Sequence, residues 1–203
     1  KKHKKMMNII LLFNMVMVMS ASIDSLEASF SKEVLTLSNS QYGLLVSLAG
    51  VGFVFGSIVN SLLFQKTATL KLISIGTWFI SIGYVVYSFS SGFSIAAFGF
   101  ILLSFSQAFA NIGYDTFYQN NIPISIMGRI GSYLGLFHAF FVIIFTIIFG
   151  FTAKIFSIQQ IVILGASFML IFSILLIYIV FIFIKTKHSS NQSNGTINLQ
   201  ITK

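Results

Sequence analysis

The chain has no cysteine and few charges of either sign. The absence of cysteine excludes disulfide bonds, thiolate metal sites and a thiol nucleophile. Charged residues make up 8% of the 203 residues, hydrophobic residues make up 56%, and the mean hydropathy is +0.94. A water-soluble domain carries about 25% charged residues to cover its surface. The composition therefore excludes a soluble globular fold and predicts an all-α integral membrane protein.

Enzyme signatures are missing as well. The sequence contains no His-Glu-x-x-His, no Gly-x-Ser-x-Gly and no phosphate-binding glycine loop ending in Lys-Ser/Thr. We therefore expect no enzymatic activity, no cofactor and no metal.

Proline and arginine occur once each, at Pro123 and Arg129, with long apolar runs on both sides. Proline biases the residue before it away from helix, so a helix should end near Asn121. A guanidinium is costly in hydrocarbon, so Arg129 should mark a water-facing loop that includes Gly128. These loop residues are our candidates for a gate.

The uncharged runs are best counted in membrane spans of roughly 20 residues each. They predict six transmembrane helices, at about residues 6–30, 41–64, 72–89, 93–117, 130–153 and 158–184. Ser38-Asn39-Ser40 predicts the start of the second span, and Ser90-Ser91-Gly92 separates the third from the fourth. Residues 185–203 are polar and Asn/Ser-rich, and we expect a disordered tail there.

The cations predict the orientation in the membrane. With the N-terminus inside, the inside segments hold Lys1, Lys2, Lys4, Lys5, Lys66, Lys71, Arg129, Lys185, Lys187 and Lys203, whereas the outside loops hold only Lys32 and Lys154. This is a strong positive-inside pattern, and it places both termini in the cytoplasm of a multi-pass cell-membrane protein. The net charge of +8 is explained by these helix-end cations and their contacts with anionic lipid, not by nucleic acid.

Two spans carry glycines four residues apart: Gly52 and Gly56 in the second span, and Gly131 and Gly135 in the fifth. This spacing lets helix backbones approach closely. Each pair lies in the middle helix of a three-helix group, as a 3+3 inverted repeat would have it. Chance is the alternative, because the chain has 15 glycines.

Asp24 and Glu27 are the first candidates for transport chemistry. An ionisable side chain within a span is a functional-site hypothesis by default, and residues three apart share a helix face. Two close carboxylates in low dielectric push at least one pKa upward, as a proton-exchanging group requires. The alternative is a wet outer mouth where the pair only ends the span.

A second polar set lies deeper in the chain. Gln107, Asn111 and Asp115 are spaced by four and form one stripe, which either lines a cavity or packs on neighbouring helices. Asp115 has a further alternative, a clasp with Arg129 across the inner loop. His138 could relay protons or simply hydrogen-bond to a neighbouring helix, and Asn14 is a candidate for cavity lining or for packing.

The segment from Asp24 to Ser57 contains Tyr42-Gly43-Leu44-Leu45 followed by a glycine-rich helix. It resembles the major facilitator superfamily at the join between the seventh and eighth helices of its bacterial drug and macrolide exporters. Gln119, Pro123 and Gly128-Arg129 are similar to the family's pattern between the tenth and eleventh helices. The resemblance covers about residues 6 to 184.

The resemblance implies the C-terminal half of a twelve-helix transporter that exports hydrophobic small molecules by alternating access, coupled to protons. Its partners would be the substrate, the lipid bilayer and an N-terminal six-helix half, in the same polypeptide or in a second subunit. The chain is then expected to be a piece of a longer protein. An uptake permease and a six-helix membrane scaffold without a transport cycle are the alternatives.

Overall fold

The structure is a computed structural model that describes the backbone of residues 2–63 and 69–201, and side chains within 4–62 and 69–185. Its elements are α1 (Lys2–Asp24), α2 (Glu27–Ser29), the π-helix η1 (Phe30–Val34), α3 (Asn39–Leu63), α4 (Thr69–Ser88), α5 (Phe93–Asn121), α6 (Ile124–Thr152) and α7 (Ile158–Ile201). The described residues contain no strand, and six of the helices are long and apolar enough to cross a membrane. The predicted all-α bundle of six spanning helices is confirmed.

Local sequence signals explain where several helices begin. Ser38 and Gln41 exchange side-chain and backbone hydrogen bonds, at 2.9 and 3.2 Å, and so cap the start of α3. Ser157 and Gln160 do the same for α7, at 3.3 Å each. Between α4 and α5 the chain turns at Phe89–Gly92, where the Ser-Ser-Gly signal predicts a break.

The first span is shorter than predicted. α1 ends at Asp24 rather than near residue 30, and α2 and η1 follow as separate short turns. The hydroxyls of Ser22 and Ser25 donate to the carbonyls of Val18 and Ser22, at 2.7 and 2.6 Å. The Leu26 N–H bonds to the Ile23 carbonyl at 2.9 Å, three residues back, so the helical ladder closes in a tight turn at this point.

The expected loop around Arg129 is also shorter than predicted. α5 continues to Asn121 and α6 already begins at Ile124, with Pro123 at its N-cap position. Proline is well tolerated at a helix start, where its missing N–H would have no helical partner. Gly128 and Arg129 therefore lie in the first turns of α6 and not in a loop.

The last helix is longer than predicted. α7 runs on to Ile201, so residues 185–201, for which we expected disorder, continue the helix. The segment contains no proline that would stop it. Residues 202 and 203 of the expected tail lie outside the described residues, as do residue 64 at the end of the predicted second span and residue 66 after it.

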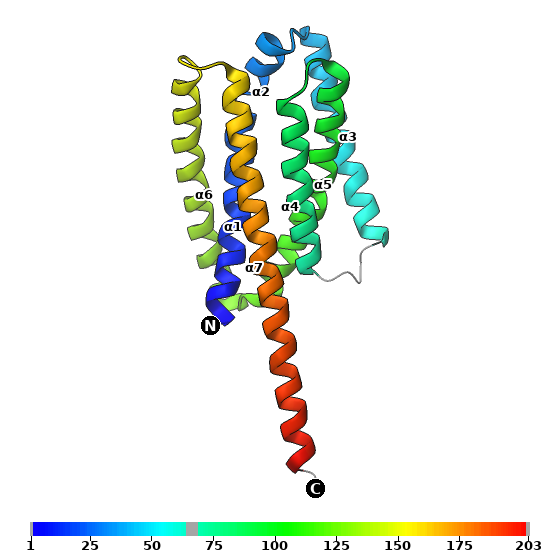
Figure 1. Cartoon of the computed structure of the whole chain (residues 1–203), viewed down its shortest axis with the longest axis vertical. Coiled ribbons are helices and arrows are strands. Elements are labelled where there is room, and N and C mark those ends of the chain that lie inside the picture. Colours follow the sequence, from blue (N-terminus) through cyan, green and yellow to red (C-terminus); the bar gives the residue numbers. More distant parts are fainter. Residues whose placement is uncertain (1, 64–68, 202–203) are drawn as a thin grey trace.

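The helices pack in a row, in the order α6, α1, α7, α4, α5 and α3 (Figure 1). α1 packs on α6 and α7, while α5 packs on α3 and α4, and α7 meets α4 in the middle. The first three long helices, α1, α3 and α4, can be matched in order to the last three, α5, α6 and α7. The contact of α1 with α6 then corresponds to that of α5 with α3, the contact of α1 with α7 corresponds to that of α5 with α4, and the contact of α4 with α7 corresponds to itself. The bundle therefore has the contact pattern of two interlocked three-helix repeats.

The middle helix of each three-helix group is the least covered. In α6, which the structure describes throughout, Phe149 alone is buried. In the described part of α3 only a narrow stripe is buried, consisting of Leu45, Gly52, Gly56 and Asn60. Large apolar side chains such as Val51 and Leu136 are 64% and 71% exposed on the remaining faces of the two helices. Both helices leave apolar surface free for lipid or for another helical bundle.

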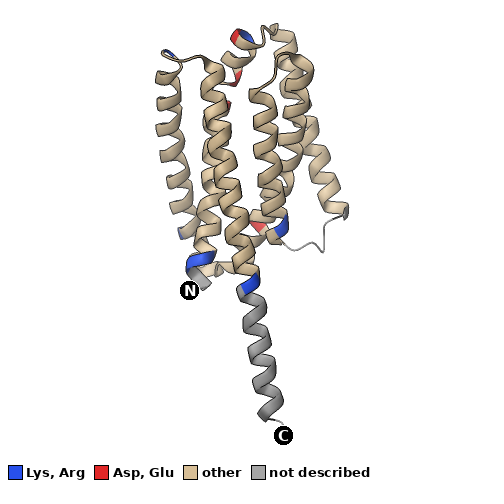
Figure 2. Ribbon diagram, viewed as in Figure 1, with Lys and Arg blue, Asp and Glu red and all other residues tan. Residues whose placement is uncertain are grey.

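Charge is distributed unequally between the two ends of the bundle (Figure 2). Lys4 and Lys5 in α1, Lys71 in α4, Arg129 in α6 and Lys185 in α7 lie at the end where α1 begins. Lys32 in η1 and Lys154 after α6 lie at the opposite end. The other predicted inside cations, Lys1, Lys2, Lys66, Lys187 and Lys203, fall outside the described side chains.

Candidate functional site

Two acidic and three tyrosine side chains gather where α1 ends, opposite the end rich in cations. We define the acidic–tyrosine cluster as Ser20, Asp24, Glu27, Tyr42, Tyr84 and Tyr87. The residues come from α1, α2, α3 and α4, so the cluster joins elements far apart in the sequence. The cluster forms because these elements place polar residues at the same depth in the bundle, and no single stretch of the sequence contains it.

Tyr84 connects two residues of α1. Its hydroxyl donates a 2.7 Å hydrogen bond to Oδ1 of Asp24 and lies 2.7 Å from the Ser20 hydroxyl. Ser20 and Asp24 are four residues apart, so one turn of helix places both toward Tyr84. Tyr84 and Ser20 are buried, whereas Asp24 remains exposed at the mouth of the bundle. A water-accessible carboxylate is thus tied to an interior hydroxyl pair.

Glu27 lies next to this pair, at the start of α2 and outside the membrane-spanning segments. Burial, together with the negative charge of Asp24, raises the pKa of Glu27 to about 7, although a hydrogen bond with Tyr42 opposes the shift. Desolvation disfavours the ionised carboxylate, and a like charge nearby does so further. Glu27 is therefore set to exchange protons near neutral pH.

Tyr87 completes the cluster from one turn further along α4. Its ring packs between Phe30 and Phe100, with ring centroids 4.7 Å apart in each case. Its hydroxyl lies 3.4 Å from both the Glu27 carbonyl and the Ser31 hydroxyl. These distances are at the long limit for an O–H···O bond, so Tyr87 contributes packing more than polar contact.

Sequence reasoning placed Asp24 and Glu27 together, and the structure brings them into one cluster. It missed the tyrosines and Ser20. One available signal was the spacing of Tyr84 and Tyr87, which are three residues apart and therefore on one face near the end of a span. Nothing in the sequence shows that this face of α4 meets α1.

The nitrogen of the Asn14 side chain donates to the Ile10 carbonyl at 2.9 Å and to the Tyr114 hydroxyl at 3.1 Å. The Tyr114 ring stacks on Phe13, with centroids 4.2 Å apart. Asn14 therefore links α1 to α5, and it is satisfied by packing partners.

The stripe on α5 points away from the core. Gln107 and Asn111 are half-buried and Asp115 is exposed. Among the described side chains no ion pair joins Asp115 to Arg129, which is also exposed. The three side chains leave polar surface accessible, as a cavity wall requires. The alternative ion pair between Asp115 and Arg129 is absent from this conformation.

The remaining candidates are spread along α6. Pro123, Gly128 and Arg129 are exposed near its start, and His138 is half-buried about two turns further on. The Tyr118 hydroxyl donates to the Met127 carbonyl at 2.6 Å and thereby holds the start of α6 against α5. These residues do not reach the acidic–tyrosine cluster.

The two glycine pairs differ in their surroundings. A Cβ on Gly52 would lie 3.0 Å from the Ile101 carbonyl oxygen, and one on Gly56 would lie 2.5 Å from the Phe105 carbonyl oxygen. α3 therefore approaches the backbone of α5 through this pair. A Cβ on Gly135 would meet nothing within 4 Å, and one on Gly131 would lie 3.4 Å from the Tyr118 hydroxyl. The pair on α6 is free of close backbone contact.

The chain matches no protein-family model and no curated protein.

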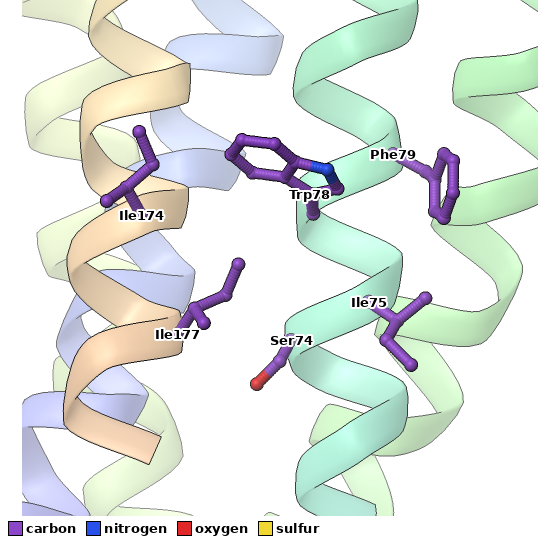
Figure 3. Close-up of a pocket in the computed structure, with 6 residues that line it drawn as sticks. All are labelled: Ser74, Ile75, Trp78, Phe79, Ile174 and Ile177. Carbon is purple, nitrogen blue, oxygen red and sulfur yellow. The ribbon is translucent and has the colours of Figure 1, made fainter. Parts of the chain in front are cut away.

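A second feature is an apolar groove of about 380 Å³ between α4 and α7. Figure 3 shows Trp78 of α4 facing Ile174 and Ile177 of α7 across it. The Ser74 hydroxyl in the groove is already bonded to the Leu70 carbonyl at 2.9 Å. The groove offers apolar surface and little to orient a polar ligand. Among the described residues, no group of three His, Asp or Glu side chains could hold a metal ion.

Proposed function

We propose that this chain forms one six-helix bundle of a membrane secondary transporter that works by alternating access. The observation that carries the proposal is the interlocked packing of two three-helix groups, in which α3 and α6 occupy equivalent and largely open positions. Transporters built from such repeats move one bundle against another around a site near the midplane. The open apolar faces of α3 and α6 provide surface for the second bundle.

The acidic–tyrosine cluster supports coupling to protons. Carboxyl groups at a membrane boundary that exchange protons near neutral pH can use a proton gradient. Glu27 is such a group, because its pKa is raised to about 7, and the Asp24 carboxylate beside it is open to water. We assign the coupling to these two residues, and we leave Asp115, Gln107 and Asn111 as candidates for the cavity wall.

The unequal distribution of cations supports a cell-membrane location with both termini in the cytoplasm. The cluster then faces the outside. Efflux of hydrophobic small molecules follows from the resemblance to drug and macrolide exporters, carried by Tyr42-Gly43-Leu44-Leu45 and by Pro123 with Gly128-Arg129. In that arrangement the partner is an N-terminal six-helix half.

The first test is the mass of the natural product in its own membranes, measured by immunoblot with an antibody to a C-terminal peptide. A band near twice 22.5 kDa is expected, because a rocking pair needs two bundles. A band at 22.5 kDa that stays monomeric on crosslinking in the membrane would contradict the proposal.

The second test is efflux by the product identified in this way. Cells lacking their own drug exporters are loaded with a fluorescent hydrophobic cation dye, and its efflux is followed with and without a protonophore. We expect protonophore-sensitive efflux that Asp24→Asn lowers at least about a hundredfold, the lower end of the range typical of general acid–base groups. The exposed Glu33 of η1 supplies the matched control, and Glu33→Gln should leave efflux unchanged. A scaffold would show no efflux above cells without the protein.

A further inference from the structure

The Ser20–Tyr84–Asp24 chain has a defined direction of hydrogen bonding. An ionised carboxylate can only accept, so the single hydroxyl hydrogen of Tyr84 goes to Asp24 Oδ1. The Tyr84 oxygen is then left as an acceptor, and the Ser20 hydroxyl at 2.7 Å must donate to it. Both Ser20 and Tyr84 are buried, so water does not compete for the bond between them. Donation therefore runs outward, from Ser20 through Tyr84 to Asp24.

Protonation of Asp24 changes what each group can offer. A carboxylic acid has a hydrogen to donate, and the Tyr84 oxygen is the acceptor already within reach. If Asp24 donates to Tyr84, the Tyr84 hydrogen turns to Ser20. The Ser20 hydroxyl then bonds to a carbonyl in its own helix, as Ser22 does with Val18. The added proton comes from solvent, and the two hydroxyl hydrogens only rotate about their C–O bonds.

We propose that Tyr84 is a positioning residue that reverses this hydrogen-bond chain when Asp24 gains a proton, and so carries the protonation state of the mouth into the interior of α1. α1 packs mainly on α6 and α7, and α4 mainly on α5 and α7. The Ser20–Tyr84–Asp24 hydrogen bonds thus link α1 directly to α4, two helices that otherwise have few contacts with each other. Its use in a transport cycle rests on the proposed function, but the reversal itself does not.

Other titratable groups lie near Asp24 on the neighbouring elements. Glu27 of α2, Tyr42 of α3 and Tyr87 of α4 interact electrostatically within the same cluster. α6 and α7 also pack on α1. Between His138 in α6 and Tyr178 in α7 the sequence has one titratable side chain, that of Lys154. The ammonium of Lys154 lies 5.5 Å from the centre of the Phe151 ring. Tyr42 and Tyr87 are therefore the tyrosines whose response must be separated from that of Tyr84.

The test is infrared difference spectroscopy of the protein in lipid nanodiscs, with ring-labelled tyrosine. Spectra are compared at a pH well above and a pH well below the titration range of the carboxyl pair. The phenol C–O stretch differs between a tyrosine that donates to a carboxylate and one that accepts from a carboxylic acid. All variants also carry Tyr42→Phe, which removes the tyrosine bonded to Glu27. We expect a shift of the labelled band in the natural protein and in Tyr42→Phe alone, and its complete loss when Tyr84→Phe is added. Tyr87→Phe, at a site equally buried in the same helix, should keep it.

Ser20→Ala tests the second link and guards against misfolding of the tyrosine variant. It leaves the Tyr84–Asp24 bond in place but removes the acceptor that reversal needs. The Asp24 carboxyl band should still titrate in this variant, while the tyrosine shift disappears. A tyrosine shift that survives in Tyr84→Phe or Ser20→Ala, that is lost equally in Tyr87→Phe, or that is absent from the natural protein would overturn the proposal. None of these results depends on efflux, so failure of the transporter assignment would be seen separately.

Discussion

The contact between α3 and α5 allows a quantitative prediction at Gly56. A Cβ at this position would lie 2.5 Å from the Phe105 carbonyl oxygen and 3.1 Å from its carbonyl carbon. These are backbone atoms of a neighbouring helix and cannot rotate away as a side chain would. Gly56→Ala therefore forces the two helices apart.

The magnitude follows from a comparison with Gly50, six residues earlier in α3. A Cβ on Gly50 meets nothing within 4 Å. Both substitutions gain the same helix propensity, up to about 1 kcal/mol. Their difference therefore isolates the overpacking cost, which is about 1–3 kcal/mol for an inserted methyl group. This corresponds to a roughly 5-fold to 160-fold lower ratio of folded to unfolded protein for Gly56→Ala.

The assay is unfolding of the purified protein by a denaturing detergent titrated into mild micelles. Trp78 is the only tryptophan, and it lies between α4 and α7, so its fluorescence reports the packing of the bundle. Gly56→Ala should unfold at a clearly lower fraction of denaturing detergent than Gly50→Ala. Equal midpoints for the two variants would refute the close approach of α3 to α5.

Three further outcomes are expected. Because the folded-state pKa of Glu27, about 7, lies above its ordinary value of 4.5, the native state binds more protons between these values. Stability should fall as pH rises through this window, and Glu27→Gln should flatten the fall in the same detergent titration; an unchanged slope would contradict the burial of Glu27. Thr36 has a φ of 52°, a left-handed conformation that costs an ordinary residue roughly 1–2 kcal/mol. Thr36→Gly should therefore raise the free energy of unfolding by about 1 kcal/mol, and a loss of stability would show that the hydroxyl outweighs the strain. In the naturally cysteine-free chain, Ser91→Cys between α4 and α5 should react with an impermeant maleimide on intact cells, whereas Ser125→Cys at the start of α6 should react only after permeabilisation; the reverse pattern would invert the topology.

The membrane bundle itself could be predicted because it depends on quantities that add up along the chain. Apolar length sets the number of spans, and Ser-Ser-Gly and Ser38 with Gln41 mark breaks and starts through local hydrogen bonding. Boundaries failed where a local competition decided them. α1 ends early at Asp24, where a bond from the Leu26 N–H to the Ile23 carbonyl closes a tight turn, and Pro123 starts α6 instead of opening a longer loop.

The candidate site was predictable only in part. Asp24 and Glu27 stood out because carboxylates in an apolar chain are costly, whatever surrounds them. Tyr84 did not stand out, since a tyrosine near the end of a span is ordinary until its partners are known. The same limit applied to the glycine pairs. Gly52 and Gly56 have the same spacing as Gly131 and Gly135, yet only α3 meets a neighbouring backbone through its pair.

The sequence by itself determined that this chain belongs in a membrane, how many times it crosses, and which end carries the cations, because hydropathy and charge act on each segment separately. The tertiary structure decided which helix faces meet. It placed α4 beside the end of α1, so that Tyr84 lies within 2.7 Å of both Ser20 and Asp24, and it left α3 and α6 open. These pairings depend on how side chains and backbones of distant segments fit together in three dimensions, and the order of residues along the chain does not show which segments fit.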